Sequence, residues 1–142
     1  MKERYATLDM ATQRARAARR VFDCAALPAG ATRVQVAIIG AGPVGLAAAA
    51  DLTRHGVQCV VLDRVNTLSD GSRAICWAKR SLEICDRLGI AHTMLDKGIT
   101  WNVGRVYCGS EVEPLYSFDL LPDKQQKFPA FINLQQYYTE EY

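Results

Sequence analysis

The chain has 142 residues, of which 49% are apolar, and a formal net charge of +2. This length suits about one globular domain. So small a charge, without a basic stripe interleaved with aromatic residues, argues against a nucleic-acid-binding protein. The longest uncharged stretch, 34–50, contains three glycines and a proline. It is somewhat shorter than a membrane span, so we expect no membrane association.

Residues 1–32 precede the first predicted strand. Their Ala-rich and Arg-rich part, 11–20, is predicted to be helical. One interpretation is an organelle transit peptide, because such presequences are rich in arginine and poor in acidic residues. Glu3, Asp9 and Asp23 favour the alternative, a solvated helical extension.

The central pattern of the chain is a strand, a glycine-rich turn, a helix and a second strand. Residues 36–39, VAII, predict the first strand, and the Ala-rich and Leu-rich residues 44–55 predict the helix. Gly56 stands where a helix stop is expected. The second strand, 57–62, is a nearly continuous apolar run, which is typical of a parallel strand covered on both faces.

The turn, GAGPVG at 40–45, has the glycine spacing of a dinucleotide-binding βαβ unit. Gly40 would permit the tight turn that leaves the first strand. Gly42 would let a pyrophosphate approach the backbone, and Gly45 would let the helix pack closely on the strand. The alternative is a buried glycine-rich helix start without a ligand.

Two further features of this unit favour a nucleotide. The N–H groups at the helix start, roughly 43–46, would face an anion along a favourable helix dipole, and Pro43 loses nothing in a first turn. Asp63 follows the turn by about twenty residues, where a carboxylate can accept hydrogen bonds from an adenosine ribose. We therefore predict a nucleotide site at this turn.

The rest of the chain alternates between helical and strand patterns. A polar loop over 65–72 is followed by an amphipathic helix over 78–88, which Gly89 ends, and by a short helix over 92–97. Two or three antiparallel strands are predicted over 100–118. A polar loop over 121–127, a strand over 131–134 and the start of a helix over 135–142 complete the chain.

Two of these elements have predicted faces. In the helix over 78–88, the side chains available to the core are Leu82, Ile84, Cys85 and Leu88. In the antiparallel section, the candidate face residues are Trp101, Val103, Val106, Tyr107, Leu115, Tyr116 and Phe118.

The cysteines and histidines carry no metal pattern. The five cysteines, at 24, 59, 76, 85 and 108, are odd in number and lack a CxxC spacing. We predict that they are reduced, small apolar residues of a cytoplasmic protein rather than a disulfide framework or a zinc site. His55 and His92 are isolated in the sequence, so no metal site is expected.

Residues 71–90, GSRAICWAKRSLEICDRLGI, carry a resemblance to a known family. They resemble the second signature of the FAD-dependent aromatic-ring hydroxylases, the single-component flavoprotein monooxygenases related to para-hydroxybenzoate, phenol and hydroxyphenylpropionate hydroxylases. In that family a strand with GAGPVGL is followed by an acidic residue, an Arg-Ala pair and a helix reading R-[ST]-x-E-x-x-x-x-x-G. The matching residues are Arg73, Ala74, Arg80, Ser81, Glu83 and Gly89.

A weaker match lies at the end of the chain. Gln136, followed four residues later by Glu140, is similar to the family's glutamine that approaches the flavin. The resemblance covers about 34–142, with aspartate at position 63 where many relatives carry glutamate.

The resemblance implies FAD as the cofactor and a role for each matching residue. The three glycines would line the pyrophosphate and Asp63 would hold the ribose. Arg73 would reach the diphosphate region through charge-assisted bonds, and Gln136 would contact the sugar-like chain or ring side of the flavin. The predicted cofactor-binding residues are Gly40, Ala41, Gly42, Pro43, Val44, Gly45, Asp63, Arg64, Arg73 and Gln136. No catalytic residue is predicted, because the cofactor carries the chemistry.

The predicted fold class is α/β, a Rossmann-like FAD/NAD(P)-binding βαβ unit with a small antiparallel β section. We expect it to be incomplete at the C-terminus, because a doubly wound sheet needs more parallel strands than the two strong ones found. The predicted domains are an N-terminal helical extension, 1–32, and the N-terminal part of an FAD-binding domain, 33–142, with the start of the substrate-domain β section.

The resemblance implies a monooxygenase that hydroxylates a small-molecule aromatic substrate with O2 and with NADH or NADPH. One alternative is another FAD-dependent oxidoreductase, an oxidase or reductase, which the helix motif after Arg73 fits less well. The other is a truncated nucleotide-binding fragment without activity of its own. We expect the isolated chain to copurify with little FAD.

Overall fold

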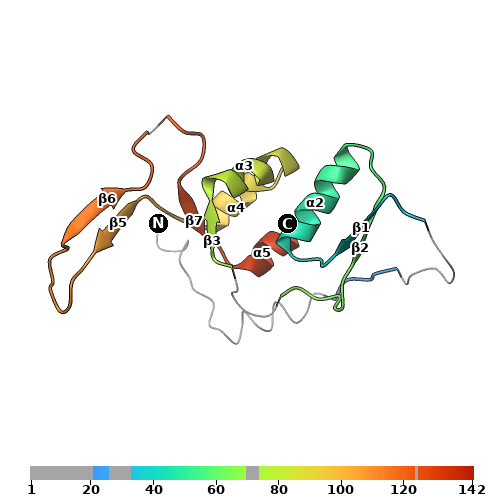
Figure 1. Cartoon of the computed structure of the whole chain (residues 1–142), viewed down its shortest axis with the longest axis horizontal. Helices are drawn as coiled ribbons and strands as arrows, with labels where there is room; N and C mark the ends of the chain where they lie inside the picture. Colours follow the sequence, from blue (N-terminus) through green and yellow to red (C-terminus); the bar gives the residue numbers. More distant parts are fainter. Residues whose placement is uncertain (1–20, 26–32, 70–73, 124) are drawn as a thin grey trace. The chain divides into compact units, whose positions relative to one another are not determined.

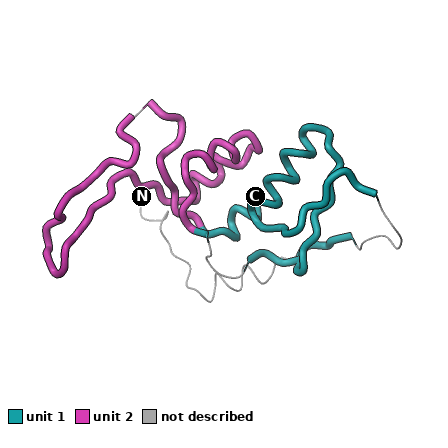
Figure 2. Tube along the Cα trace, viewed as in Figure 1, with its two compact units in different colours: residues 1–74, 135–142 teal, residues 75–134 magenta. Residues whose placement is uncertain are grey.

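The computed structural model describes residues 21–25, 33–69, 74–123 and 125–142. It divides into two compact units, shown in teal and magenta in Figure 2. Unit 1 comprises Met1–Ala74 together with Gln135–Tyr142, and unit 2 comprises Ile75–Leu134. The helix predicted over 11–20 lies outside the described residues.

Unit 1 is built on the predicted βαβ arrangement. Strand β1 (Val36–Ile39) and strand β2 (Cys59–Leu62) pair in parallel, and helix α2 (Pro43–Arg54) connects them (Figure 1). The register places Ile39 opposite Leu62, so the two strands end side by side. The chain therefore leaves both strands at the same edge of the sheet.

The β1–β2 sheet is less buried than predicted. Helix α2 packs on the sheet, yet β1 alternates between half-buried and exposed residues, and Ile39 is 79% exposed. All four residues of β2 are half-buried. The cover predicted for both faces of the second strand is therefore only partly present among the described residues, where α2 packs against the pair.

The ends of α2 follow from its sequence. The helix begins at Pro43, one residue before the predicted start, and ends at Arg54, one residue before the predicted end. Gly56 follows with a φ of +73°, a left-handed conformation that glycine adopts readily and that commonly ends a helix.

Helix α5 (Gln136–Glu141) also belongs to unit 1 and packs against α2. Its buried residues are Tyr137, Tyr138 and Thr139. Near the start of the chain, Val21 forms a bridge with Thr67, and the Phe22 amide donates to the Asn66 carbonyl at 2.9 Å. The described part of the N-terminal region is therefore extended along the loop that follows β2.

Unit 2 contains an antiparallel sheet and two helices. Strand β7 (Phe131–Asn133) lies between β3 (Cys76–Ala78) and β4 (Ile99–Trp101). Helices α3 (Lys79–Leu88) and α4 (Ala91–Lys97) follow β3. The largest fully buried side chains are Leu82, Met94, Ile132 and Leu134. Strand β3 is absent from the sequence prediction, because it runs directly into α3 and its last residue, Ala78, fits the helical pattern predicted to begin there.

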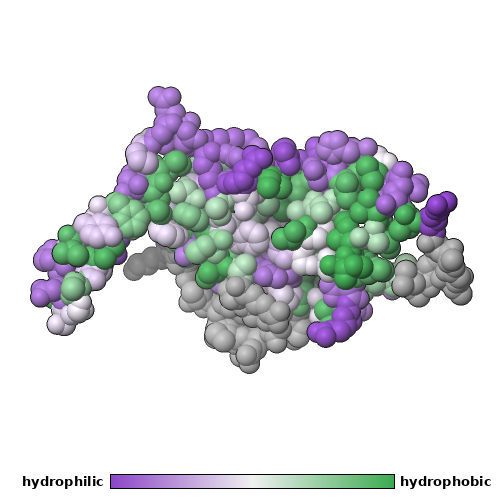
Figure 3. Space-filling model, in the orientation of Figure 1, coloured by the Kyte–Doolittle hydropathy of each residue, from purple (hydrophilic) through white to green (hydrophobic). Residues whose placement is uncertain are grey.

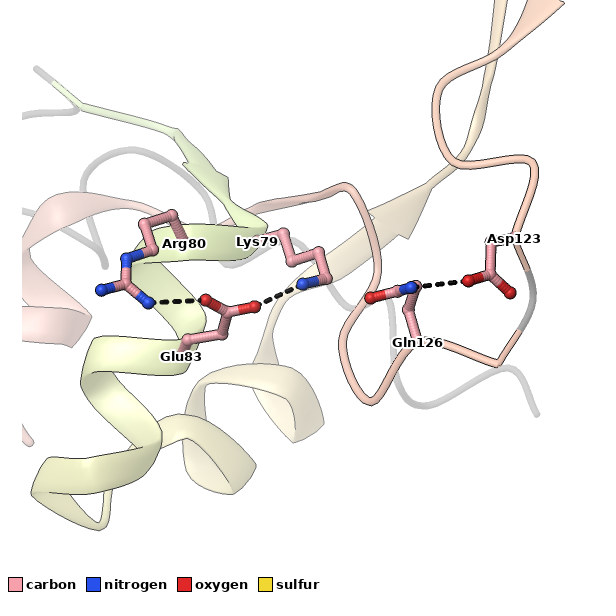
Figure 4. Close-up of polar contacts among 5 residues, drawn as sticks. All are labelled: Lys79, Arg80, Glu83, Asp123 and Gln126. Carbon is pink, nitrogen blue, oxygen red and sulfur yellow. Dashed lines mark hydrogen bonds and ion pairs between the residues drawn. The ribbon is translucent and has the colours of Figure 1, made fainter.

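Helix α3 has the predicted amphipathic arrangement. Leu82 and Cys85 are buried, and on the polar face Lys79 and Arg80 both donate to the Glu83 carboxylate (Figure 4). The hydrogen bond from Lys79, with that from Arg80 second, lowers the pKa of Glu83. In the loop after β6 (Tyr116–Asp119), the Gln126 side chain donates to Asp123 at 2.7 Å.

A hairpin of β5 (Val103–Val106) and β6 lies apart from this core. Gly104 faces Phe118, and a Cβ at Gly104 would lie 2.3 Å from the ring. Five of the seven candidate face residues of this section are exposed, namely Val103, Tyr107, Leu115, Tyr116 and Phe118. Figure 3 shows apolar side chains at the surface of the hairpin.

The predicted elements and the described ones agree in type, so the α/β fold class is confirmed. Within the described ranges, no helix has the length and apolar character needed to cross a membrane. All five cysteines carry free thiols; Cys85 is buried, whereas Cys24, Cys76 and Cys108 are exposed. Among the five, Cys85 has the burial that is usual for a small apolar side chain.

Candidate nucleotide-binding site

The turn after β1 depends on a glycine at position 40. Gly40 has a φ of +111°, a conformation that a residue with a Cβ rarely adopts. Its amide donates to the Leu62 carbonyl at 2.7 Å, which joins the turn to the end of β2. The tight turn predicted at Gly40 is present.

Gly45 is the point where α2 approaches the turn most closely. A Cβ at this position would lie 1.9 Å from the Gly40 carbonyl oxygen and 3.3 Å from Cγ2 of Ile38. Only a hydrogen fits against the backbone at the first of these distances. The close helix packing predicted for Gly45 is therefore confirmed.

Gly42 has open space beside it instead. A Cβ here would meet nothing within 4 Å. Gly42 is the N-cap of α2, no side chain caps this end, and the first turn carries no acidic residue. A phosphate could therefore approach the backbone at Gly42 without meeting a side chain there or an acidic residue of the first turn.

The set of free amides at the start of α2 is smaller than predicted. The Leu46 amide donates to the Gly42 carbonyl at 2.9 Å, so it already belongs to the helix. Pro43 has no N–H group. The amides of Val44 and Gly45 remain for an anion, and the expected range of roughly 43–46 is corrected to these two residues.

Asp63 holds the turn in place. The Ala41 amide donates to Asp63 Oδ2 at 2.6 Å, and the Val65 amide donates to Oδ1 at 3.0 Å. These bonds, that from Ala41 first, lower the pKa of Asp63 below its ordinary value. Each carboxylate oxygen keeps a second lone pair, so the side chain can still accept a hydrogen bond from a ribose hydroxyl.

The bond between Ala41 and Asp63 is absent from the sequence prediction, although the sequence holds a signal for it. In a parallel pair that ends together, the residues that follow the two strands are neighbours. Ala41 and Asp63 are the second residue after Ile39 and the first after Leu62. Because both residues come just after strands that are predicted to pair, their positions in the sequence indicate that they are neighbours.

Three predicted site residues remain, and the structure describes two of them. Arg64 is exposed and lies next to Asp63. Arg73 lies outside the described residues. Gln136 is the first residue of α5, and its Nε2 donates to Glu140 Oε1 at 2.6 Å. The described members of the predicted site all belong to unit 1.

Unit 1 also contains polar groups that sequence reasoning missed. The Ser69 amide donates to Glu140 Oε2 at 2.8 Å. The hydroxyls of Ser69 and Thr139 are buried and have no hydrogen-bond partner. Buried hydroxyls are usually paired, so these two are exceptions among the described residues. The open space at Gly42 fits a cofactor that contains phosphate groups.

Comparison with known proteins identifies the family. The family model described as "FAD binding domain" matches residues 33–141. A flavin-dependent monooxygenase of Mycobacteroides abscessus is 37% identical over 112 residues, which cover 75% of this chain and 24% of the relative. Pentachlorophenol 4-monooxygenase of Sphingobium chlorophenolicum is 31% identical over 98 residues, covering 68% of this chain and 18% of the relative.

Solved structures agree with this match. The flavin-dependent monooxygenase PieE, solved with FAD and substrate, has a TM-score of 0.62 and 26% identity over 78% of this chain and 21% of that protein. The p-nitrophenol 4-monooxygenase of Pseudomonas putida has a TM-score of 0.64 and 25% identity over 75% of this chain and 27% of that protein. The chain thus spans about a quarter or less of the two curated relatives. Its turn, its fold and the family match over 33–141 together show that the chain belongs to the family of FAD-binding domains.

Proposed function

We propose that this chain forms the FAD-binding part of a flavin-dependent monooxygenase that hydroxylates a small aromatic molecule, with NADH or NADPH as electron donor. The observation that carries the proposal is the glycine turn, where Gly42 leaves the backbone open in a chain of the FAD-binding family. Support for the substrate class comes from relatives named for phenol oxidation, among them pentachlorophenol 4-monooxygenase.

The proposed binding roles follow the geometry of unit 1. The amides of Val44 and Gly45 would bind the pyrophosphate, which can come close because Gly42 has no side chain. Asp63 would hold the turn through Ala41 and accept a ribose hydroxyl with its free lone pairs. Arg64 and Arg73 remain proposed contacts of the phosphate region, where a guanidinium can pair with phosphate oxygens.

The same proposal includes the redox chemistry of the parent enzyme, the domain to which this chain belongs and the cellular compartment. Bound FAD would supply the redox chemistry with O2, and the protein supplies position and polarity. No side chain of this chain is proposed as an acid, a base or a nucleophile. Residues 33–142 would form the N-terminal part of the FAD-binding domain, and five free thiols are consistent with a cytoplasmic enzyme.

A substitution at Gly42 tests the site without disturbing the fold. Gly42→Ala adds a methyl group that meets no protein atom within 4 Å, so the variant should fold, with a loss of stability limited to the cost of alanine at an N-cap, about 1 kcal/mol. It should nevertheless weaken FAD binding by about tenfold or more, which corresponds to about 1.4 kcal/mol, because the methyl occupies the space of the phosphates. Binding is measured by titrating FAD into the purified chain and following flavin fluorescence.

The matched control is Ala50→Ser, which adds one atom at an exposed position of α2. It should bind FAD with wild-type affinity. Equal affinities of the wild type and Gly42→Ala would contradict the proposed site. A wild-type chain that binds no added FAD would contradict the proposed function itself.

A further inference from the structure

Glu140 joins two distant segments of unit 1 through both oxygens of one carboxylate. Oε1 accepts a hydrogen bond from Gln136 Nε2 at 2.6 Å, one turn earlier on α5. Oε2 accepts from the backbone amide of Ser69 at 2.8 Å, across 71 positions of sequence. Both bonds are partly buried. The carboxylate therefore ties α5 to the segment that follows β2.

The bond to Glu140 fixes which end of the Gln136 amide points away from it. A carboxylate only accepts hydrogen bonds, so the NH2 group of Gln136, and not its oxygen, must face Glu140. Oε1 of Gln136 is then turned away from Glu140 and remains an acceptor. Since the bond is short and charge-assisted, the opposite orientation would bring two acceptors together.

Two hydroxyls associated with this carboxylate are buried without a hydrogen-bond partner. The Ser69 hydroxyl is buried without a partner, on the residue whose amide binds Glu140. The Thr139 hydroxyl, on the residue before Glu140, is also unpaired, and Thr139 is only 9% exposed. Helix α5 packs on α2, which begins at the glycine turn.

We propose that Glu140 is a positioning residue of the FAD site, which makes Gln136 present its amide oxygen to the cofactor. The ligand group that meets Gln136 is then a hydrogen-bond donor of FAD, a hydroxyl of the sugar-like chain or the N–H of the flavin ring. Glu140 acts through Gln136 and does not itself touch the cofactor. This inference rests on the proposed function, because it takes FAD as the ligand.

The Glu140→Gln variant separates the two bonds of the carboxylate. Its amide oxygen can still accept from the Ser69 amide, but its NH2 group can also face the oxygen of Gln136, so the orientation of Gln136 is no longer imposed. We expect the Ser69 amide to keep its protection from hydrogen exchange in Glu140→Gln and to lose it in Glu140→Ala. In both variants FAD affinity should fall by about tenfold.

A double-mutant cycle shows whether Glu140 acts through Gln136. In a Gln136→Ala background, Glu140→Gln should change the FAD dissociation constant by less than about twofold, because the amide to be oriented is gone. Glu141→Gln is the matched control, since it removes the same charge from the next residue of α5. It should leave FAD affinity and the flavin absorbance spectrum at wild-type values.

Two results would overturn the inference. One is an unchanged FAD affinity and flavin spectrum in Glu140→Gln; the other is a full tenfold effect of Glu140→Gln when Gln136 is already alanine. A wild-type chain without FAD binding would instead refute the proposed function. In that case the orientation of Gln136 is tested without FAD, by the NMR signals of its side-chain amide in the free chain. If the Glu140 carboxylate holds this amide, the signals must shift between the wild type and Glu140→Gln.

Discussion

The glycines of the turn are required for two different reasons at the scale of single residues. At Gly45 the protein backbone itself fills the space, whereas at Gly42 the space is open. The same substitution, glycine to alanine, should therefore damage folding at one position and ligand binding at the other.

Gly45→Ala should destabilise the chain strongly. Its Cβ would lie 1.9 Å from the Gly40 carbonyl oxygen, which belongs to the backbone and cannot rotate away. We expect a loss of about 3 kcal/mol in the free energy of unfolding, at the upper end of overpacking costs. Urea denaturation measures this loss, with Gly42→Ala as the control. Equal midpoints for the two variants would show that α2 can move away from the turn at little cost.

Asp63 should make the chain sensitive to acid. Its pKa in the folded state is lowered, with the Ala41 amide as the main cause. The stabilisation is therefore present above the unfolded pKa of about 4 and is lost as the pH falls through the folded value. Asp63→Asn should show a shallower decrease of unfolding free energy below about pH 4 than the wild type. Parallel pH curves for the two proteins would remove Asp63 from this role.

At the scale of elements, the sequence patterns predicted most helices and strands because their periodicity is long enough to be read. The βαβ arrangement follows from apolar runs separated by a glycine turn, and α3 follows from its amphipathic spacing. The prediction missed β3, which runs directly into α3 with no turn residue between the two elements. For the hairpin, the alternating pattern shows which residues share a face but not whether another element covers that face.

In the candidate site, too, the sequence predicted local features but not contacts between distant segments. The glycine roles could be predicted from spacing, because they depend on local backbone geometry. The contact between Ser69 and Glu140 depends on how α5 packs, and 71 positions separate the two residues. No local pattern encodes such a pairing, so only a tertiary structure reveals it.

Leu82→Ala should weaken the core of unit 2. Leu82 is fully buried on α3, and its removal leaves a cavity that costs about 2–5 kcal/mol. Leu115→Ala is a suitable control, because Leu115 is 70% exposed on the hairpin. Hydrogen exchange at the amides of β7 measures the effect. A similar change in both variants would mean that the hairpin contributes to this core.

At the scale of the whole molecule, the described site residues are confined to unit 1, although the sequence of that unit is divided between the two ends of the chain. FAD should therefore slow hydrogen exchange in the glycine turn, at 63–65 and in α5. The amides of β7 in unit 2 should exchange at an unchanged rate.

ADP is the matched ligand for this experiment, because it carries the adenosine and pyrophosphate without the flavin. It should protect the turn and 63–65, as FAD does, but leave α5 unprotected, since Gln136 is proposed on the flavin side. Protection of α5 by ADP would place Gln136 elsewhere in the site. Equal slowing throughout both units would indicate general stabilisation instead of local binding.

The distribution of the cysteines supplies each unit with its own chemical reporter. Cys59 is half-buried in β2 of unit 1, and Cys85 is buried in α3 of unit 2, where burial raises the pKa of its thiol. Iodoacetamide should therefore alkylate Cys24, Cys76 and Cys108 first. The later labelling of Cys59 and of Cys85, resolved by peptide mass spectrometry, then times the opening of one unit independently of the other.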